Sequence, residues 1–159
     1  MTAFVAGSIL TTRLSVTRAQ TEPPPTARSP PSTAPPSTGA LVTSVPTGGG
    51  VRFFAVGEGA VWVQNNVDGT VTRVDPATNR AVATIAVDSG PVDGGDLAVG
   101  GGYVWARVTD TLVAKIDPAT NTVIARYSPA AGSGSVAADS TAAWVSAHDE
   151  DLVYRLPLG

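Results

Sequence analysis

The chain has 159 residues, of which 43% are hydrophobic and 14% are charged, which is enough to fill the core of one domain of ordinary size. Ten Lys and Arg against thirteen Asp and Glu give a net charge of -3. No basic stripe could release counterions from a phosphate backbone, so nucleic acid is not an expected partner. The sequence contains no Cys, which excludes disulfides, thiolate metal sites and a cysteine nucleophile.

The first 19 residues are open to two interpretations. Residues 1–10 are apolar but too few to cross a bilayer, and the charges of Arg13 and Arg18 prevent the apolar run from continuing, so no transmembrane helix is predicted. The segment fits a secretory signal peptide cleaved after Ala19, whereas Arg13 and the missing basic start count against one. An export signal and an ordinary terminus both stay open.

Residues 20–40 form a linker in which Pro alternates with Ser, Thr and Ala. Proline removes backbone donors and favours the polyproline II conformation, and this segment has almost nothing to bury. It is either a stalk that holds a domain away from a membrane or cell wall, or a plain disordered terminus. With the leader, it predicts a secreted or cell-envelope protein.

Residues 41–159 contain an internal repeat. Trp62 and Trp105 are 43 residues apart, and Trp105 and Trp144 are 39 apart. This is the spacing of about 40 to 50 residues that propeller blades show. The segments AVGEGAVWV, AVGGGYVWA and AADSTAAWV surround them, and a later strand in each repeat carries a basic residue: Arg73, Lys115 and Arg155. Alternating β-branched segments bounded by turn residues predict an all-β fold of three four-stranded antiparallel β-propeller blades.

Several residues of the repeat are expected to shape turns or the core. The three Trp are expected to be buried, packed between neighbouring blades or on the inner strands, rather than to stack on a ligand. Asp68-Gly69 predicts a two-residue hairpin, and the carboxylates of Asp75 and Asp117, each followed by Pro, are expected to accept from the backbone two residues on. The glycines expected to have positive φ in hairpin turns are Gly57, Gly59, Gly100, Gly101 and Gly102.

On these motifs, with DPATN occurring twice in register, the chain resembles the YVTN-type and virginiamycin B lyase-like β-propellers. Their blades commonly read AVG-x-G-x-x-W-V and then R-I-D-P-x-T. The resemblance implies the fold for residues 41–159 and is not specific to one function. Such propellers usually have six or seven blades, whereas this chain has three.

The order of strands raises the question of how the ring closes. An outer strand is expected before the second inner strand and before the third inner strand. Residues 41–45 stand in the same position before the first inner strand, so they are expected to be an outer strand without a blade of their own. The last repeat lacks its outer strand. Three twisted blades are too few to close alone. One hypothesis is a six-bladed dimer in which each chain donates residues 41–45 to its partner's last blade. The other is that the chain relies on missing blades of a larger propeller.

One face of such a propeller carries most of the charged loop residues, where a small-molecule or protein ligand would bind. Carboxylates and one neutral His suit a divalent cation, whereas a charged loop is most often only solvated. The expected ligand-face residues are Asp68, Asp93, Asp96, Arg107, Asp110, Asp149 and Asp151.

The leading expectation is a non-catalytic, extracytoplasmic binding or sensing module. The alternative comes from the resemblance to virginiamycin B lyases, in which a His and a Glu from different blades act with Mg²⁺ to open an ester linkage by elimination. It would place catalysis on His148 and Glu150. The chain has no second His, so the cross-blade partners of that family are missing. A third interpretation is a degraded gene product without a selected function.

Overall fold

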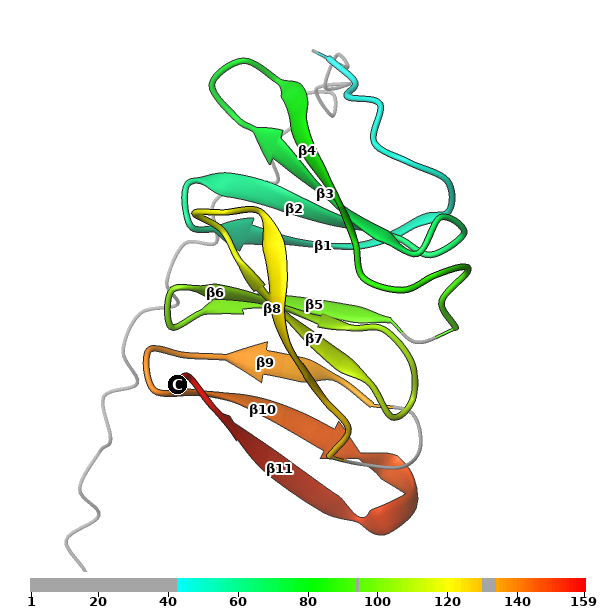
Figure 1. The fold of residues 1–159 in the computed structure, drawn as a ribbon, viewed down its shortest axis with the longest axis vertical. Coiled ribbons are helices and arrows are strands. Elements are labelled where there is room, and N and C mark those ends of the chain that lie inside the picture. The colour runs from blue at the N-terminus through cyan, green and yellow to red at the C-terminus, as the bar shows by residue number, and fades with distance from the viewer. Residues whose placement is uncertain (1–42, 94, 130–133) are drawn as a thin grey trace, which may run out of the picture. The chain divides into compact units, whose positions relative to one another are not determined.

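Residues 43–93, 95–129 and 134–159 are described in the computed structural model, and all belong to a unit that spans residues 40–159. They form eleven strands in three antiparallel sheets, with one turn of 3-10 helix, η1 (His148–Glu150) (Figure 1). No helix of these residues is long and apolar enough to cross a membrane. The predicted all-β fold of blade-like repeats is confirmed. The domain boundaries predicted before residue 41 lie outside the described residues.

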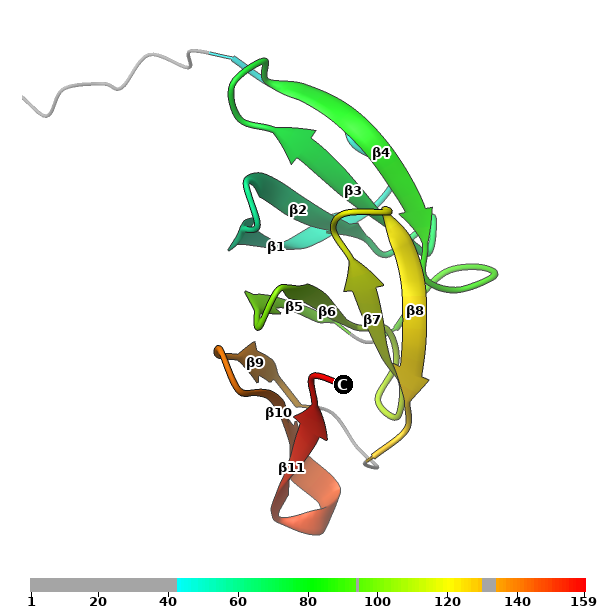
Figure 2. The same ribbon diagram turned by 60° about the vertical axis from the view of Figure 1, so that its left-hand side comes forward.

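Each sheet follows the order of the chain, so every connection inside a sheet is a hairpin. The first sheet contains β1 (Val51–Gly57), β2 (Ala60–Asn65), β3 (Thr70–Asp75) and β4 (Arg80–Ala86). The second contains β5 (Asp96–Gly100), β6 (Tyr103–Arg107), β7 (Val113–Asp117) and β8 (Thr122–Tyr127). The third contains β9 (Val136–Ala138), β10 (Ala142–Ala147) and β11 (Leu152–Pro157). The first strands of the three sheets, β1, β5 and β9, lie along one side of the unit (Figure 2).

The third sheet therefore has three strands rather than four among the described residues. Of the predicted donor strand, residues 41 and 42 lie outside the described residues, and residues 43–45 are in no strand. Val45 instead lines a cavity on the first sheet together with Val61 and Val63. The structure thus gives the segment before β1 a packing role on its own blade, because Val45 shares a cavity with two valines of β2.

The hairpin turns between the first two strands of a blade differ in detail from the prediction. Glu58 and Gly59 have φ of 49° and 70°, and Gly101 and Gly102 have φ of 64° and 83°. Two successive positive φ values are typical of the type I′ turns that join antiparallel strands. Asp68-Gly69 is not a two-residue hairpin, because the loop between β2 and β3 spans residues 66–69.

Gly57 and Gly100 lie in strands and do not have positive φ, so that prediction was wrong. Their role is close approach between blades. A Cβ at Gly57 would lie 2.5 Å from Cγ1 of Val99, and one at Gly100 would lie 2.7 Å from the carbonyl carbon of Ala138. Both neighbours belong to the next blade, so the missing side chain allows the blades to touch.

The two Asp-Pro turns form as predicted. Asp75 Oδ1 accepts from Ala77 N at 2.8 Å, and Asp117 Oδ1 accepts from Ala119 N at 2.8 Å. Asn79 closes the first of these turns with φ of 54°, a conformation that Asn tolerates better than most residues. The carboxylate and the Asn together explain why the motif DPATN recurs at this place.

The Trp residues stack with the basic residues of the neighbouring strand. Trp62 is paired across the strands with Arg73, and the guanidinium carbon lies 5.2 Å from the ring centroid. Trp105 is paired across the strands with Lys115 in the same way, and Lys115 Nζ lies 5.3 Å from the centroid of the Trp105 ring. Because both rings are fully buried, these cation–π contacts are shielded from water.

Trp144 departs from the prediction, since 39% of it is exposed. It is opposite Arg155, whose guanidinium carbon lies 5.9 Å from the ring centroid, so the pair itself is kept. The described residues contain no further blade after the third that could cover the Trp144 ring. Burial of a Trp here depends on its neighbour and not only on its own blade.

The basic residues also hold successive blades together. Arg73 Nη1 donates to the carbonyl oxygen of Pro118 in the second blade at 2.7 Å. Lys115 Nζ donates to the carbonyl oxygen of Leu158 in the third blade. Pro118 and Leu158 each lie three residues after the basic residue of their own blade, so the bond repeats at matching positions. Burial lowers the pKa of Lys115, and the carbonyl offsets part of the desolvation of its ammonium group.

Candidate functional site

The loops predicted to carry the ligand face gather at one end of the sheets. The turn at residues 49 and 50 is hydrogen-bonded to the loop between β2 and β3, because Val67 N donates to the carbonyl oxygen of Gly49 at 3.1 Å. That loop is bonded in turn to the segment between β4 and β5, through Val92 N and the carbonyl oxygen of Asn66 at 2.8 Å. These backbone bonds fix the position of each loop.

Asp68 and Asp93 are both exposed at this end. Asp68 Oδ2 accepts from Gly49 N at 2.6 Å, so its carboxylate secures the turn that leads into β1. This is a structural contact that the sequence did not predict. Asp93 remains an exposed carboxylate on the segment before β5, and its predicted role in binding stays a prediction.

Asp96 links the second blade to the third. Its Oδ1 accepts from Leu97 N and its Oδ2 accepts from Val136 N, both at 2.9 Å. Val136 begins β9, so the carboxylate joins the inner strands of two blades. Each oxygen of the Asp96 carboxylate therefore accepts one backbone bond within the fold.

Arg107 is 1% exposed and is also a link between blades. Nη1 donates to the carbonyl oxygen of Ser146 at 2.9 Å, and Nη2 donates to that of Asp110 at 2.7 Å. Burial lowers the pKa of Arg107, while the carboxylates of Asp110 and Asp96 act in the opposite direction. The guanidinium therefore lies inside the fold rather than on a face open to ligand, whereas Asp110 is exposed.

His148 and Glu150 lie on η1 between β10 and β11, and both are exposed. His148 Nδ1 lies 3.1 Å from Asp149 Oδ1, with 79% and 66% of the two side chains exposed. Tyr154 donates its hydroxyl to Glu150 Oε2, and this bond raises the pKa of Tyr154. His148 thus contacts Asp149, and Glu150 accepts from Tyr154.

A cavity of about 380 Å³ opens beside η1. Its polar groups are the imidazole of His148, the carboxylate of Asp151 and the hydroxyls of two serines, and Leu152 and Val153 add apolar surface. Ser146 Oγ accepts from Ser135 N at 2.8 Å, which joins the two serines. The complete lining is Gly134, Ser135, Ser146, Ala147, His148, Asp151, Leu152 and Val153.

Asp151 ends η1 with φ of 55°, a left-handed conformation that Asp and Asn tolerate better than most side chains. The turn places Asp151 on the cavity with His148, whereas Asp149 and Glu150 are not among its lining residues. Of the predicted site residues, the structure therefore brings two together around one cavity.

The described part of the chain contains no group of three or more His, Asp or Glu side chains that could hold a metal ion. Mg²⁺ needs several oxygen ligands in near-octahedral geometry. Glu150, the residue that would share the metal with His148, instead accepts from Tyr154. The residues present do not fit the Mg²⁺ of the lyase alternative.

The chain is similar to several solved structures at the level of fold. The crystal structure of the RRP9 WD40 repeats matches 67% of this chain and 38% of that chain, with a TM-score of 0.54 and 14% identity. Kuenenia stuttgartiensis hydrazine synthase matches 69% of this chain and 32% of that chain, with a TM-score of 0.52 and 14% identity. U3-55K matches 66% of this chain and 36% of that chain, with a TM-score of 0.51 and 12% identity. The chain thus spans about a third of the length of each.

These likenesses establish a β-propeller repeat and say nothing about ligands or activity. The narrower resemblance to the YVTN-type and virginiamycin B lyase-like propellers stays a prediction. No curated protein matches the chain. The model of a family described as a repeat of unknown function, DUF6923, matches residues 31–147, and the chain belongs to this family.

Proposed function

We propose that the blades form a non-catalytic binding module, and that the ligand binds in the cavity between His148 and Asp151. The observation that supports this most is the chemistry of the lining. It combines a carboxylate, an imidazole and hydroxyls with the apolar side chains of Leu152 and Val153. Cavities that combine apolar walls with a few polar groups are typical binding sites.

The charge at this place favours a ligand with a positively charged group. Asp149, Glu150 and Asp151 follow one another along the chain beside His148, and all are exposed. Arg107, which could have balanced them, is buried and donates to backbone carbonyls. The proposed ligand class is accordingly a cationic peptide segment or a small cationic molecule that also covers the apolar wall.

Residues 1–19 would serve as an export signal and residues 20–40 as a stalk, so the blades would act outside the cytoplasm. The composition of residues 20–40 supports this, because a Pro-rich segment is a stiff and well-solvated spacer. The lyase activity is not proposed, since the described residues include no group of three or more His, Asp or Glu side chains that could hold its Mg²⁺.

His148 is the single histidine of the chain, so its ring is a unique NMR reporter of the cavity. Titration with a tetralysine peptide is expected to shift the ring signals, and a tetraglutamate peptide of the same length is expected to leave them unchanged. Asp151→Asn is the matched variant, because Asn tolerates the left-handed turn and lacks the charge. It should weaken the tetralysine response at least about threefold.

Equal shifts with both peptides, or no shift with either, would contradict the proposed site. Catalysis is tested separately by incubating the chain with virginiamycin B and Mg²⁺ and following the antibiotic by mass spectrometry. A binding module leaves its ester linkage intact. Ring opening that is lost in His148→Ala would overturn the non-catalytic assignment.

A further inference from the structure

The two ends of the blade array carry surfaces that are buried wherever they recur inside the array. On the face of each blade that points to the following one, the Trp is 0% exposed in the first and second blades and 39% exposed at Trp144. The exposed fraction changes in the same way for the Val that stands two residues before Arg73, Lys115 or Arg155. It is 0% exposed at Val71, 1% at Val113 and 64% at Val153. Trp144, Val153 and Arg155 together are called the C-terminal end face.

The opposite end shows the same contrast. The residue before the repeated Ala of the inner strand is 6% exposed at Leu97 and 5% at Val136, because the preceding blade covers it. In the first blade it is Phe54, which is 71% exposed, as is Val56. Phe54 and Val56 stand opposite Val63 and Val61 and share one face of the sheet with them. This is the N-terminal end face, completed by Val74, Pro76 and Asn79.

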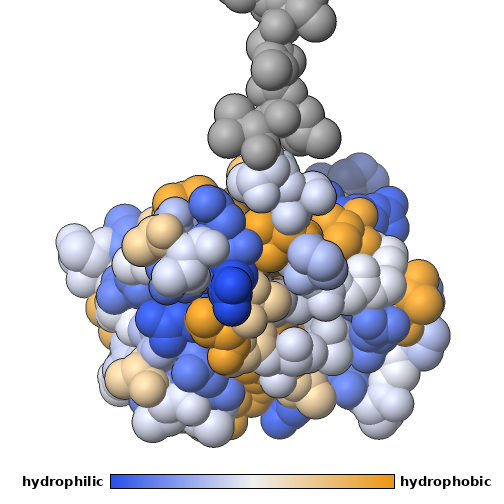
Figure 3. All heavy atoms as spheres, turned by 90° about the horizontal axis from the view of Figure 1, so that it is seen from above, coloured by the Kyte–Doolittle hydropathy of each residue, from blue (hydrophilic) through white to orange (hydrophobic). Residues whose placement is uncertain are grey.

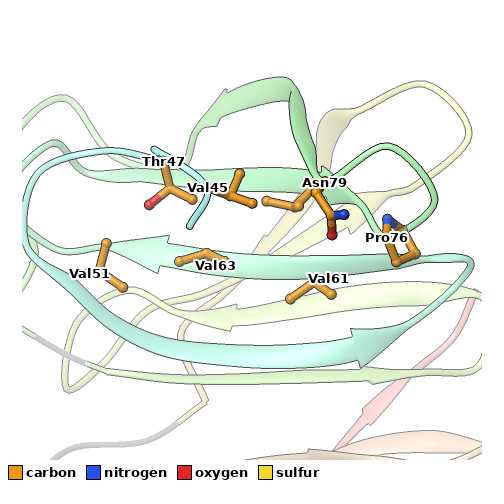
Figure 4. Close-up of a pocket in the computed structure, with 8 residues that line it drawn as sticks. Val45, Thr47, Val51, Val61, Val63, Pro76 and Asn79 are labelled. Atoms are coloured by element: carbon orange, nitrogen blue, oxygen red, sulfur yellow. The ribbon is translucent and has the colours of Figure 1, made fainter. Parts of the chain in front are cut away.

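A cavity of about 350 Å³ lies on the N-terminal end face (Figure 4). Val61, Val63 and Val74 form its floor, and Val45 closes part of it. Figure 3 looks onto this end of the unit and shows apolar patches interrupted by polar side chains. An apolar surface with a polar rim is the usual composition of a protein interface.

Hydrogen-bond donors and acceptors match across the two end faces. Inside the array, Arg73 Nη1 donates to the carbonyl oxygen of Pro118 at 2.7 Å and to Asn121 Oδ1 at 3.0 Å. Arg155 is the corresponding donor of the third blade, and it is exposed and donates to Thr141 O within its own blade. Pro76 and Asn79 occupy in the first blade the places of Pro118 and Asn121.

We propose that the C-terminal end face of one chain binds the N-terminal end face of a second copy, and reciprocally, so that two chains close a ring of six blades. Trp144 and Val153 would then cover Phe54 and Val56, and Arg155 would donate to Pro76 and Asn79 of the second copy. A second copy is the occupant because it supplies the same face that the two internal junctions use. The two contacts are equivalent by twofold symmetry, so the assembly is closed.

The segment before β1 does not need to move in this assembly. Val45 covers Val61 and Val63 of the first blade, as Val87 packs in one cluster with Val104 and Ala106 of the second. In the second blade, the segment that contains Val87 and the whole first blade together cover the corresponding face. The contact between copies therefore differs from an exchange of residues 41–45, because it joins faces and leaves Val45 in place.

One position makes the contact between copies looser than the internal junctions. Gly57 and Gly100 allow the next blade to approach closely, and Asp139 is the residue at the same place in the third blade. A Cβ at Gly57 would lie 2.5 Å from Val99, so Asp139 must hold Val56 of the second copy further away. The dimer is accordingly expected to dissociate on dilution, and Asp139→Gly is expected to tighten it.

The test is sedimentation velocity on the 159-residue chain over a range of concentrations. The wild type should change from monomer to dimer as concentration rises. Phe54→Lys and Val153→Lys each place a charge on one end face and should raise the dimer dissociation constant at least about tenfold. Both side chains are exposed in the single chain, so both variants are expected to fold, which thermal melting verifies. Ile124→Lys on β8 alters an equally apolar exposed side chain outside both end faces and should dimerise like the wild type.

Mixing the two end-face variants gives the sharpest result. Each variant associates with itself weakly, because both junctions of its homodimer contain a charged face, but a mixed pair has one junction with two native faces. The mixture should therefore dimerise at concentrations at which each variant alone is monomeric. A folded wild type that stays monomeric at all concentrations, or a mixture that stays monomeric, would overturn the proposal. Val153 also lines the cavity beside His148, whereas Phe54 does not, so Phe54→Lys tests the dimer separately from the ligand site, which is followed through the His148 ring.

Discussion

Arg107 and Ser146 join the second blade to the third, since the buried guanidinium donates to the carbonyl oxygen of Ser146 at 2.9 Å. Gln64 makes the equivalent bond one blade earlier, where Nε2 donates to the carbonyl oxygen of Arg107 at 2.9 Å. All three residues lie two positions after the Trp of their blade. The two bonds form a continuous connection through the three sheets.

Replacing Arg107 tests this connection. Arg107→Ala removes two charge-assisted bonds and leaves their carbonyl acceptors without this donor, so the free energy of unfolding should fall by about 2 to 4 kcal/mol. Urea denaturation measures the loss. Arg80→Ala on the exposed start of β4 is the control and should change stability by less than about 0.5 kcal/mol. Equal losses in the two variants would contradict the role of Arg107.

A pair of glycine substitutions tests the close approach of the blades. A Cβ at Gly100 would lie 2.7 Å from the backbone of Ala138, so Gly100→Ala should reduce the free energy of unfolding by about 1 to 3 kcal/mol. Gly90 has open space around it, and Gly90→Ala should be neutral or stabilise by up to about 1 kcal/mol. Thermal melting compares them. A stable Gly100→Ala variant would show that the blades can separate there without cost.

The stability contributed by Asp139 should depend on pH. The Thr141 hydroxyl and backbone N–H lower the pKa of Asp139 from 3.8 to about 2. A carboxyl group with a lowered pKa in the folded state stabilises the fold above its unfolded pKa, and this contribution is lost as pH falls toward the folded pKa. The melting temperatures of wild type and Asp139→Asn should therefore differ fully above about pH 4 and converge between about pH 4 and pH 2.

Thr141→Ala serves as the control for this effect, because it removes the first cause of the shift. The carboxyl signal of Asp139 in an NMR titration should then move toward the ordinary range. A difference between wild type and Asp139→Asn that stays constant down to about pH 2 would show that the carboxylate charge contributes nothing.

Fluorescence distinguishes the three Trp residues. Acrylamide should quench only Trp144 at protein concentrations low enough for monomer, since Trp62 and Trp105 are fully buried. Trp144→Phe should remove the quenched fraction of the emission, and Trp62→Phe should leave it. Under conditions that favour the dimer, the quenching of Trp144 should fall. Uniform quenching of all three would contradict the described packing.

Much of the fold could be predicted from the sequence because the repeat acts locally. The spacing of the Trp residues and the two Asp-Pro turns depend on strand pairing and turn chemistry inside one blade, and both turns form as predicted. Gly57 and Gly100 were misassigned because their constraint comes from the next blade and not from their own turn. Trp144 was misassigned for the same reason, since its burial requires a neighbour.

The candidate site was harder to predict because a sequence does not distinguish a charged loop residue that faces a ligand from one that bonds to the next blade. Asp96 and Arg107 were expected on the ligand face, yet both are used in bonds between blades. Their partners are backbone groups of Val136 and Ser146, which no residue type identifies. His148 and Asp151 do share a cavity, and the left-handed turn at Asp151 that brings this about is visible only in the structure.

Gln64, Arg73, Arg107 and Lys115 each donate to a backbone carbonyl oxygen of the following blade, and Arg73 donates in addition to Asn121 Oδ1. Every amino acid provides the carbonyl acceptor, so these four backbone contacts need no matched side chain in the following blade. A gene that gains or loses one whole repeat by unequal recombination would thus keep these contacts at the new boundary.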